Sequence, residues 1–330
     1  MAGPQRASTG WTGVTPSDFT TNSYASDAGG FIPELWVPKM VEQFYAASVF
    51  GEISSTEYSG EIVNHGDNVK IRVTPSITVS NYQIGQALTY QTPTASTVDL
   101  NIDQAKSFSL AIDNIDKYQS DLDLMDNFAM AASESLKVAI DSSLLAAMKG
   151  SADIVAANKG TAAGALSGNL NLGADDAAVG DQSVQVDATT VIDYILKHGQ
   201  VLDEQNVPET GRWIVIPAFM ARLLKSSDLK DASITGDAKS VLRNGRIGTI
   251  DRFTVYTSNN LPAAAQTDEL ASKARMVYSG HPSCLAFASQ ITENEVMPNP
   301  DTFGKLMRGL QVYGSKIVKG EGITEGCVRE

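Results

Sequence analysis

The chain has 330 residues, of which 25 are Lys or Arg and 38 are Asp or Glu, so its formal net charge is −13. Because no segment carries a clear surplus of basic residues, we do not expect it to bind nucleic acid by neutralising phosphates. The hydrophobic fraction of 42% is sufficient to bury a substantial core. The two cysteines, Cys284 and Cys327, are far apart in the sequence, which excludes a disulfide framework and is typical of reduced thiols.

The sequence has neither of the apolar segments that direct a chain to a membrane. Residues 1–13 lack the apolar region of a signal peptide, and no run of about 18 apolar residues occurs anywhere in the chain. We therefore expect a protein that is soluble and intracellular when it is made, with no membrane partner.

The first part of the chain predicts an arm rather than a domain. Residues 1–30 are rich in Gly, Ser, Thr and Asn and show no helical or strand period, so we expect an extended arm that is ordered only by outside contacts. From Phe31 to Tyr45, apolar residues recur at helical spacing around Pro38. This pattern predicts a short amphipathic helix that serves as a docking element.

Three segments alternate apolar and polar residues, as half-buried strands do: 68–74, 97–103 and 108–112. We predict that all three are strands of an antiparallel ribbon. The connection from Pro75 to Ser96 carries no charged residue and is long for a compact domain, which is typical of a functional loop. The apolar residues of its tip are Tyr82, Ile84, Leu88 and Tyr90. A tip of this kind predicts contact with a partner surface.

The hydrophobic period then changes from that of a strand to that of a helix. Between Asp116 and Lys149, apolar residues follow one another at steps of three and four, which predicts a single α-helix on the order of 50 Å long. Gly150 is expected to end this helix in the left-handed conformation. Residues 151–182 are rich in small side chains and predict a long surface loop.

A second folded block is predicted from Val186 onward. Asp187 is expected to cap a helix that runs to about Leu202. The unbroken apolar run Trp213–Ile216 predicts a strand covered on both faces, with a helix following from Pro217. Further strands are predicted at residues 253–257, 274–280, 284–289 and 306–318, the last of them closing the chain.

None of the usual motifs of catalysis or metal binding is present in the sequence. His65, His198 and His281 lack the spacing of a metal site, so we expect structural or surface roles for them. No nucleophile elbow and no Cys/His signature occurs. Gly309–Lys316 is close to a phosphate-binding loop, but its Lys and Ser stand in reversed order and the flanking residues indicate a strand.

A charged turn precedes the apolar strand at Trp213 and is the remaining candidate for chemistry. Glu204, Glu209 and Arg212 are predicted to form a salt-linked turn, because no nucleophile or base partner lies near them in the sequence. We therefore expect no catalytic residue, no cofactor and no bound metal, and we predict that the chain is not an enzyme.

The order of the predicted elements, together with five sequence segments, resembles a known family. The segments are VPKMVEQFYAASVFGEI, HGDNVKIRV, YQTPTASTVDLNIDQAKSFSLAIDNIDKYQ, LDEQNVPETGRWIVIP and NGRIGTIDRFTVYTSNNLP. They are similar to segments of the major capsid (coat) proteins of tailed bacteriophages, which have the HK97-type fold. The similarity covers nearly the whole chain from Phe31, with the segments in the expected order.

This resemblance implies an α+β, HK97-like phage capsid fold. The implied regions are an N-terminal arm at 1–50, an extended E-loop β-ribbon with flanking strands at 51–112, the spine helix of a peripheral domain at 113–150, a mixed α/β axial domain at 151–289, and C-terminal strands at 290–330 that complete the peripheral domain. The residues that we expect at subunit interfaces are Phe31, Trp36, Val37, Tyr82, Ile84, Leu88 and Tyr90.

The implied function is that of a major capsid subunit. It would self-assemble through hexameric and pentameric capsomers into the icosahedral or prolate head shell of the virion, in the host cytoplasm. The shell would enclose double-stranded DNA without sequence-specific binding, and the acidic charge suits a lumen that must not adsorb a polyanion. The implied partners are a portal and a separate scaffolding protein, because no long extension precedes the arm, and a decoration protein is left open.

Some relatives in this family join their subunits covalently through a Lys near the E-loop tip. Since no Lys lies between Arg72 and Lys106, we predict no such crosslinking here. The main alternative is an encapsulin-like nanocompartment shell, which shares the fold but encloses cargo enzymes; the Gly-, Ser- and Thr-rich arm favours the phage protein. An enzyme would need convergent polar groups, and a secreted surface-layer protein or adhesin would need a signal peptide.

Overall fold

The computed structural model divides into two units, Met1–Glu42 and Gln43–Glu330. The residues that it describes all belong to the second unit: 48–57, 68–75, 77–81, 83–87, 90–92, 96–113, 124–175, 182–227, 248–264, 273–299 and 304–330. The predicted arm and docking helix, up to residue 47, therefore lie outside the described residues and stay predictions. The first described helix is α1 (Phe50–Ile53).

The predicted ribbon is present, but it has two strands rather than three. Strands β1 (Asn68–Val73) and β2 (Ser96–Asn101) pair antiparallel, with Val69 opposite Leu100 and Ile71 opposite Val98, as the alternation predicts. The third predicted strand, β3 (Gln104–Asp113), was wrongly assigned to this ribbon, because it pairs with β10 instead.

The connection between β2 and β3 explains this correction. Only Ile102 and Asp103 separate the two strands, and the commonest two-residue hairpin turns have a positive φ at one or both of their central residues. Neither Ile102 nor Asp103 has a positive φ, so the chain leaves the ribbon and continues into a different sheet.

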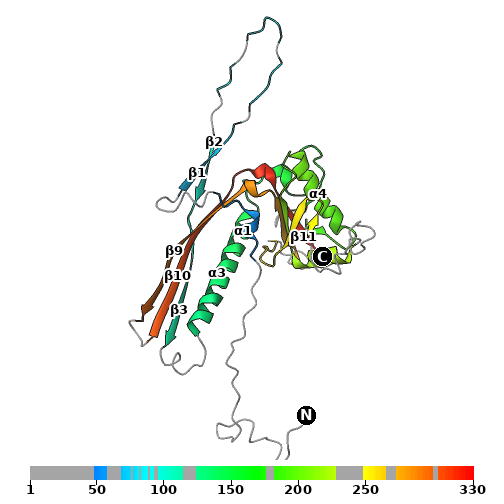
Figure 1. Cartoon of the computed structure of the whole chain (residues 1–330). Helices are drawn as coiled ribbons and strands as arrows, with labels where there is room; N and C mark the ends of the chain where they lie inside the picture. Colours follow the sequence, from blue (N-terminus) through cyan, green and yellow to red (C-terminus); the bar gives the residue numbers. More distant parts are fainter. Residues whose placement is uncertain are drawn as a thin grey trace, which may run out of the picture. The chain divides into compact units, whose positions relative to one another are not determined.

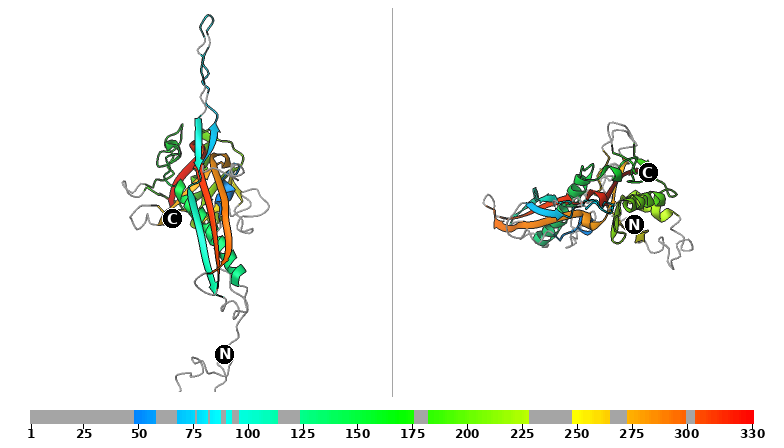
Figure 2. Two further views of the ribbon diagram at one scale, coloured as in Figure 1. Left: turned by 90° about the vertical axis from the view of Figure 1, so that its left-hand side faces the viewer. Right: turned by 90° about the horizontal axis from the view of Figure 1, so that it is seen from above.

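Strand β3 belongs to a three-stranded antiparallel sheet with the order β3-β10-β9 (Figures 1 and 2). Its other members are β9 (Leu285–Pro298) and β10 (Gly304–Ile317). Strand β9 extends well beyond the predicted segment 284–289, because its pairing with β10 continues through polar and charged sequence that breaks the hydrophobic pattern. The near-phosphate-loop Gly309–Lys316 lies within β10, so its interpretation as a strand is confirmed.

The long helix is α3, described from Leu124 to Met148, which corresponds to about 37 Å at the usual rise per residue. Residues 116–123, where the sequence predicts its beginning, lie outside the described part of the chain. Gly150 has a φ of +62°, which confirms that it ends the helix in the left-handed conformation. The hydroxyls of Ser143 on α3 and Tyr313 on β10 lie 2.6 Å apart, which ties the helix to the three-stranded sheet.

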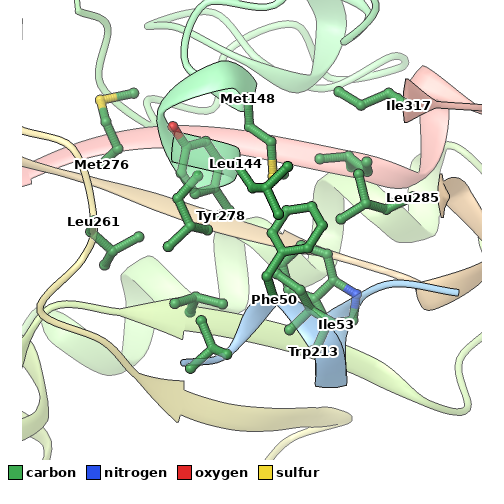
Figure 3. Packing of buried hydrophobic residues seen from close by; sticks show 14 of the residues in the cluster. Phe50, Ile53, Leu144, Met148, Trp213, Leu261, Met276, Tyr278, Leu285 and Ile317 are labelled. Atoms are coloured by element: carbon green, nitrogen blue, oxygen red, sulfur yellow. The ribbon is translucent and has the colours of Figure 1, made fainter. Parts of the chain in front are cut away.

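A hydrophobic core connects these elements with the second half of the chain (Figure 3). Its residues include Phe50, Ile53, Leu144, Met148, Trp213, Leu261, Met276, Tyr278, Leu285 and Ile317. These side chains come from α1, α3, four strands and a segment between strands. The core is therefore the place where α3 is fixed against the second sheet.

The second sheet has six strands in the order β4-β11-β8-β5-β7-β6. Their bounds are β4 Val184–Gln185, β5 Arg212–Ile216, β6 Thr249–Ile250, β7 Phe253–Thr257, β8 Arg275–Gly280 and β11 Ile323–Arg329. The β4–β11 and β5–β7 pairs are parallel, and the other pairs are antiparallel. Helices α4 (Val191–Glu204) and α5 (Ala218–Ser226) contribute to the core on one face.

Strand β5 confirms the prediction of a strand covered on both faces. All five of its residues are buried. Trp213 and Val215 point into the core that contains α3, whereas Ile214 and Ile216 point into the core that contains α4 and α5. Alternate side chains of a strand lie on opposite faces, so a continuous apolar run is what this position requires.

The last strand, β11, was missed by the sequence analysis, which ended the chain in β10. It lies between β4 and β8 in the six-stranded sheet, whereas β9 and β10 lie in the three-stranded sheet, so the C-terminal strands of the range 290–330 belong to two different sheets. The alternation is obscured by Glu325 and Gly326 in the middle of the strand. Glu325 is nonetheless buried, and its Oε1 accepts a hydrogen bond of 2.9 Å from the Gly150 backbone N–H.

The segment after Gly150 is more than the surface loop that was predicted. It contains a short 3-10 helix, η3 (Ala156–Asn158), and buries Ile154, Asn158 and Leu172. The Asn158 Nδ2 donates to backbone carbonyls of Glu321 (2.6 Å) and Ile323 (3.0 Å) near the beginning of β11. Small residues permit this close packing, and their number in the sequence was therefore a poor indicator of exposure. Two further 3-10 helices are η6 (Pro282–Cys284) and η7 (Gly320–Gly322).

Contrary to the prediction, Asp187 does not cap helix α4 directly but lies three residues before Thr190, the N-cap residue of that helix. Helix α4 begins after Thr190, whose side chain makes no capping hydrogen bond. The Asp187 Oδ1 accepts from the backbone N–H groups of Thr189 (2.8 Å) and Thr190 (2.9 Å), so it caps the turn that leads into the helix. The Thr189 hydroxyl and these two amides lower the pKa of Asp187 to about 2.

Candidate subunit interface

The base of the β1–β2 ribbon is fixed to the rest of the molecule by a small apolar cluster. Ile71 and Leu100 are buried there against Ala286 and Ala288 of β9. Close by, β10 passes the ribbon at Gly314, where a Cβ atom would lie 2.1 Å from the Asn101 carbonyl oxygen. Only glycine permits this approach. The ribbon therefore projects from an anchored base.

The described tip of the ribbon ends in a type II turn. The Gln86 backbone N–H donates to the Gln83 carbonyl (3.0 Å), and Gly85 has the positive φ of +88° that position i+2 of this turn requires. Ile84 occupies position i+1 and is 101% exposed. The turn thus presents an isoleucine at the far end of the loop, and the described parts of the loop extend beyond the ends of β1 and β2 (Figure 1).

A glutamine side chain connects the two legs of this loop. The Gln91 Oε1 accepts from the Thr78 backbone N–H (3.2 Å), and the Gln91 Nε2 donates to the Thr78 carbonyl (3.1 Å). This pair of hydrogen bonds replaces the ladder that regular strands would form. The two legs are thereby linked to each other at an exposed position.

The large apolar side chains of the described tip are exposed to solvent. The exposed fractions are 73% for Ile77, 93% for Val79, 101% for Ile84 and 89% for Tyr90. Residues 75–96 contain no charged side chain that would compensate for this exposure. A local concentration of exposed apolar side chains is typical of a surface that binds another macromolecule.

The predicted interface residues fall into two groups. Ile84 and Tyr90 lie on the exposed tip, as the sequence analysis expected. Phe31, Trp36, Val37, Tyr82 and Leu88 lie outside the described residues. Ile77 and Val79 were not among the expected residues, and their alternation in the segment ITVS is the signal that would have found them.

A buried carboxylate on α3, that of Asp141, joins three chain segments. The Asp141 Oδ1 accepts from the backbone N–H groups of Val49 (2.9 Å) and Phe50 (2.8 Å), where α1 begins. Its Oδ2 accepts from the Asn260 Nδ2 at 2.6 Å. Since Asp141 is fully buried, these hydrogen bonds compensate for the loss of water and fix α1 against α3.

The charged turn before β5 is salt-linked, as predicted, but with different partners. Arg212 is 1% exposed; its Nη2 lies 2.7 Å from the Asp203 carboxylate and donates to the Val207 carbonyl. Glu209 pairs with Arg252 at 3.0 Å. Glu204 was wrongly expected in this turn, and its carboxylate instead accepts hydrogen bonds from the segment after Gly150. No nucleophile lies among these partners.

The described histidines have structural roles, and His65 lies outside the described residues. The His198 Nδ1 lies 2.6 Å from the Thr324 hydroxyl in a fully buried position, and burial lowers its pKa to about 3, so the ring is neutral. The ring of His281 lies 2.8 Å from the Ser283 hydroxyl. Within the described ranges, no group of three or more His, Cys, Asp or Glu side chains could hold a metal ion. Cys284 and Cys327 are both free and buried.

An open hollow of about 500 Å³ lies between β2 and the end of β10. Two residues of its lining, Lys316 and Asp153, form an ion pair with 2.8 Å between the Nζ and Oδ2 atoms. No helix in the described part of the chain is long and apolar enough to cross a membrane.

The fold and the projecting ribbon define the class of protein, and comparison with known proteins identifies the family. The family model described as phage capsid protein matches residues 96–321, which is more than half of the chain. The chain therefore belongs to the phage capsid protein family. No curated protein matches it.

Solved structures agree with this assignment. A protein of Mycobacterium phage Che8 is 30% identical, with a TM-score of 0.71 over 90% of this chain and 97% of the other. The capsid structure of cyanophage P-SCSP1u (14% identity, TM-score 0.67) covers 95% of this chain and 98% of the other. The mature capsid of bacteriophage PhiM1 (16% identity, TM-score 0.63) covers 96% and 98%. Because their identities are only 14% and 16%, the last two similarities are evidence for the fold alone.

The chain is thus a major capsid protein with the HK97-type fold, and it forms the head shell of a phage. It is a structural protein rather than an enzyme, and its place is the capsid shell of the virion. Capsid homologues assemble into capsomers with copies of themselves. The nanocompartment alternative is set aside, because the family and the matched structures named above are those of phages.

Proposed function

We propose that copies of this chain form hexameric and pentameric capsomers, and that the tip of the β1–β2 ribbon packs on a neighbouring copy. The observation that carries the proposal is the uncharged tip with four exposed large apolar side chains, Ile77, Val79, Ile84 and Tyr90. Burying such side chains between subunits favours association. Because a closed shell repeats each contact many times, a weak contact per copy is sufficient.

The proposed interface keeps the residues expected from the sequence and adds two. They are Phe31, Trp36, Val37, Tyr82, Ile84, Leu88 and Tyr90, together with Ile77 and Val79. The buried base at Ile71 and Leu100 supports the proposal, because it fixes the position from which the ribbon projects.

The regions of the chain have proposed roles within the shell. These are an arm at 1–50, an E-loop with its flanking strands at 51–112, a spine at 113–150, an axial domain at 151–289 and a peripheral sheet completed by C-terminal strands. The last boundary changes from the expected 290–330, because β11 pairs with β4 and β8. We therefore place residues 323–329 with the axial domain.

The proposed partners beyond the chain itself are a portal and a separate scaffolding protein, and a decoration protein stays an open alternative. The icosahedral or prolate shell encloses double-stranded DNA without sequence-specific binding. The formal net charge of −13 supports the last point, because an acidic surface does not adsorb a dense polyanion. A strongly basic inner face in a map of the assembled shell would contradict it.

The ribbon contact is tested with the double variant Ile84→Ser, Tyr90→Ser. We expect the subunit concentration needed for shell formation to rise on the order of tenfold or more, because two apolar side chains lose their burial between copies. Electron microscopy and sedimentation measure the assembled fraction. Met130→Ser, which removes a 61% exposed side chain from α3, is the matched control. Equal assembly of the double variant and the unmodified chain would refute the ribbon contact.

The absence of Lys from the ribbon tip leads to a separate prediction. Purified particles are expected to run as a single monomer band on a denaturing gel, because no Lys between Arg72 and Lys106 is available for a covalent link at the tip. A ladder of covalent multimers would overturn the prediction that the subunits are not crosslinked.

A further inference from the structure

The segment 160–173 forms a small hairpin. Like the ribbon tip, it is uncharged, ends in a turn closed by a backbone hydrogen bond and carries an exposed large apolar side chain. It contains no charged residue; a β-bridge joins Gly160 to Gly173 and another joins Ala163 to Leu170. At its end the Gly168 backbone N–H donates to the Gly164 carbonyl at 3.1 Å. Leu166, at the tip, is 84% exposed.

A carboxylate of α4 fixes this tip. The Glu204 Oε2 accepts from the backbone N–H groups of Leu166 (2.8 Å) and Ser167 (3.1 Å), while its Oε1 accepts from the Gln200 side chain (3.0 Å). Desolvation acts to raise the pKa of Glu204, but these hydrogen bonds outweigh it and lower the pKa to about 2. The acceptor is therefore ionised at neutral pH.

The base of the hairpin is held equally firmly. Ala163 and Leu172 are buried against Val201 of α4. The Leu172 carbonyl accepts from the Tyr194 hydroxyl (2.8 Å) and from the Cys327 backbone N–H (2.9 Å). Gly164, with a φ of +104°, leaves room for the Glu204 carboxylate, because a Cβ atom there would lie 2.9 Å from its Oε2.

The result is a rigid hairpin that holds a large apolar side chain in water. Ordering a loop costs conformational entropy on binding, and a loop that is already ordered avoids this cost. A single exposed leucine is common, but one that is fixed by two backbone hydrogen bonds at the tip of an uncharged hairpin is suited to insertion into another surface.

We propose that the hairpin 160–173 is a second contact between copies of this chain, with Leu166 inserted into the neighbouring copy. The charge favours a second copy: two chains with a formal charge of −13 repel each other, so their close contacts belong at uncharged segments. The same segment has no Lys or Arg for phosphate groups, which disfavours DNA. This inference rests on the self-assembly of the chain and does not depend on the ribbon contact.

Photochemical crosslinking identifies the occupant. A photoreactive amino acid replaces Leu166, and assembled particles are irradiated and separated on a denaturing gel. We expect a band of twice the monomer mass in which mass spectrometry finds a peptide of the same chain. Adducts with DNA or with a different protein, or no adduct in well-formed particles, would overturn the proposal.

Assembly of point variants measures the contribution of Leu166. Leu166→Ser is expected to raise the subunit concentration needed for shells on the order of tenfold, with an unchanged melting temperature of the free subunit. Leu196→Ser, which removes the same side chain from a 46% exposed position on α4, is the matched control and should assemble normally. Equal assembly of both variants, or an equal loss in both, would refute a specific role for Leu166.

The role of the Glu204 clamp is tested by hydrogen exchange. Glu204→Ala should speed exchange of the Leu166 and Ser167 amides at least about tenfold and weaken assembly, because both amides lose their acceptor. Glu204→Gln keeps one acceptor oxygen and should retain slow exchange. Slow exchange in Glu204→Ala would contradict the clamp. If the unmodified chain did not assemble at all, the proposed shell function would be refuted. If Leu166→Ser assembled normally, only the proposed contact of this hairpin would be refuted.

Discussion

The six-stranded sheet and the β1–β2 ribbon differ in where their apolar side chains lie. In β5, an interior strand of the sheet, every residue is buried, and both faces are covered by other parts of the same chain. On the described ribbon tip, Ile77, Val79, Ile84 and Tyr90 are each more than two-thirds exposed. The sheet is therefore complete within one subunit, whereas the ribbon gains its burial only when another surface covers it.

The two regions also differ in the burial and the hydrogen-bond partners of their polar side chains. Inside the sheet region, buried polar side chains bond to one another, as in the His198, Ser279 and Thr324 cluster, where the two hydroxyls lie 2.5 Å apart. On the ribbon, the Gln91 amide bonds to the Thr78 backbone in an exposed position. Loss of a buried hydrogen bond costs more than loss of an exposed one. Substitutions in the two regions should therefore affect different properties.

The largest effect on stability is expected from Asp141→Ala. It removes the buried acceptor of the Val49 and Phe50 amides and of the Asn260 side chain, so we expect the free energy of unfolding to fall by about 3–5 kcal/mol. Urea denaturation of the unassembled subunit measures this change. Asp193→Ala, which removes an exposed carboxylate paired with Lys197, is the control and should cost less than about 1 kcal/mol. If Asp141→Ala also lowered the free energy of unfolding by less than about 1 kcal/mol, buried and exposed polar groups would not differ in their effect on stability.

An intermediate effect is expected from pH through His198. Burial lowers the pKa of this ring to about 3, against a usual value of 6.5. Between these values the unfolded chain binds a proton that the folded chain does not, so stability falls as the pH is lowered from 6.5 towards 3. The slope reaches at most about 1.4 kcal/mol per pH unit.

Comparison with His198→Gln isolates this contribution. Urea denaturation at several pH values from 7 to 4 should give a smaller slope for the variant. The carboxylates with lowered pKa, Asp187 and Glu204, are present in both chains, so their contributions cancel in the difference. Identical slopes in the two chains would show that His198 becomes protonated in the folded state.

The smallest effect on stability is expected at the ribbon tip. In the double variant Ile84→Ser, Tyr90→Ser, the free energy of unfolding of the free subunit should change by less than about 0.5 kcal/mol, because both side chains are exposed before and after unfolding. The same urea experiment measures it. A loss above about 1 kcal/mol would mean that the tip packs within its own subunit, and the division between the two regions would fail.

Much of the local structure could be predicted from the sequence, because it depends on short-range patterns. Alternation predicted β1 and β2, the apolar run predicted β5, and Gly150 predicted the end of α3. The uncharged connection from Pro75 to Ser96 indicated an exposed, apolar tip, and the described large apolar side chains of the tip are exposed. The five sequence segments indicated the family, which the comparisons confirm.

The pairing of strands and the partners of polar side chains were decided by the tertiary structure. β3 leaves the ribbon for β10, and β11 enters the six-stranded sheet although Glu325 and Gly326 interrupt its pattern. Glu204 holds the hairpin at Leu166 rather than the turn at Arg212. Such choices depend on which distant segments meet and exclude water, and a local pattern of residues does not contain that information.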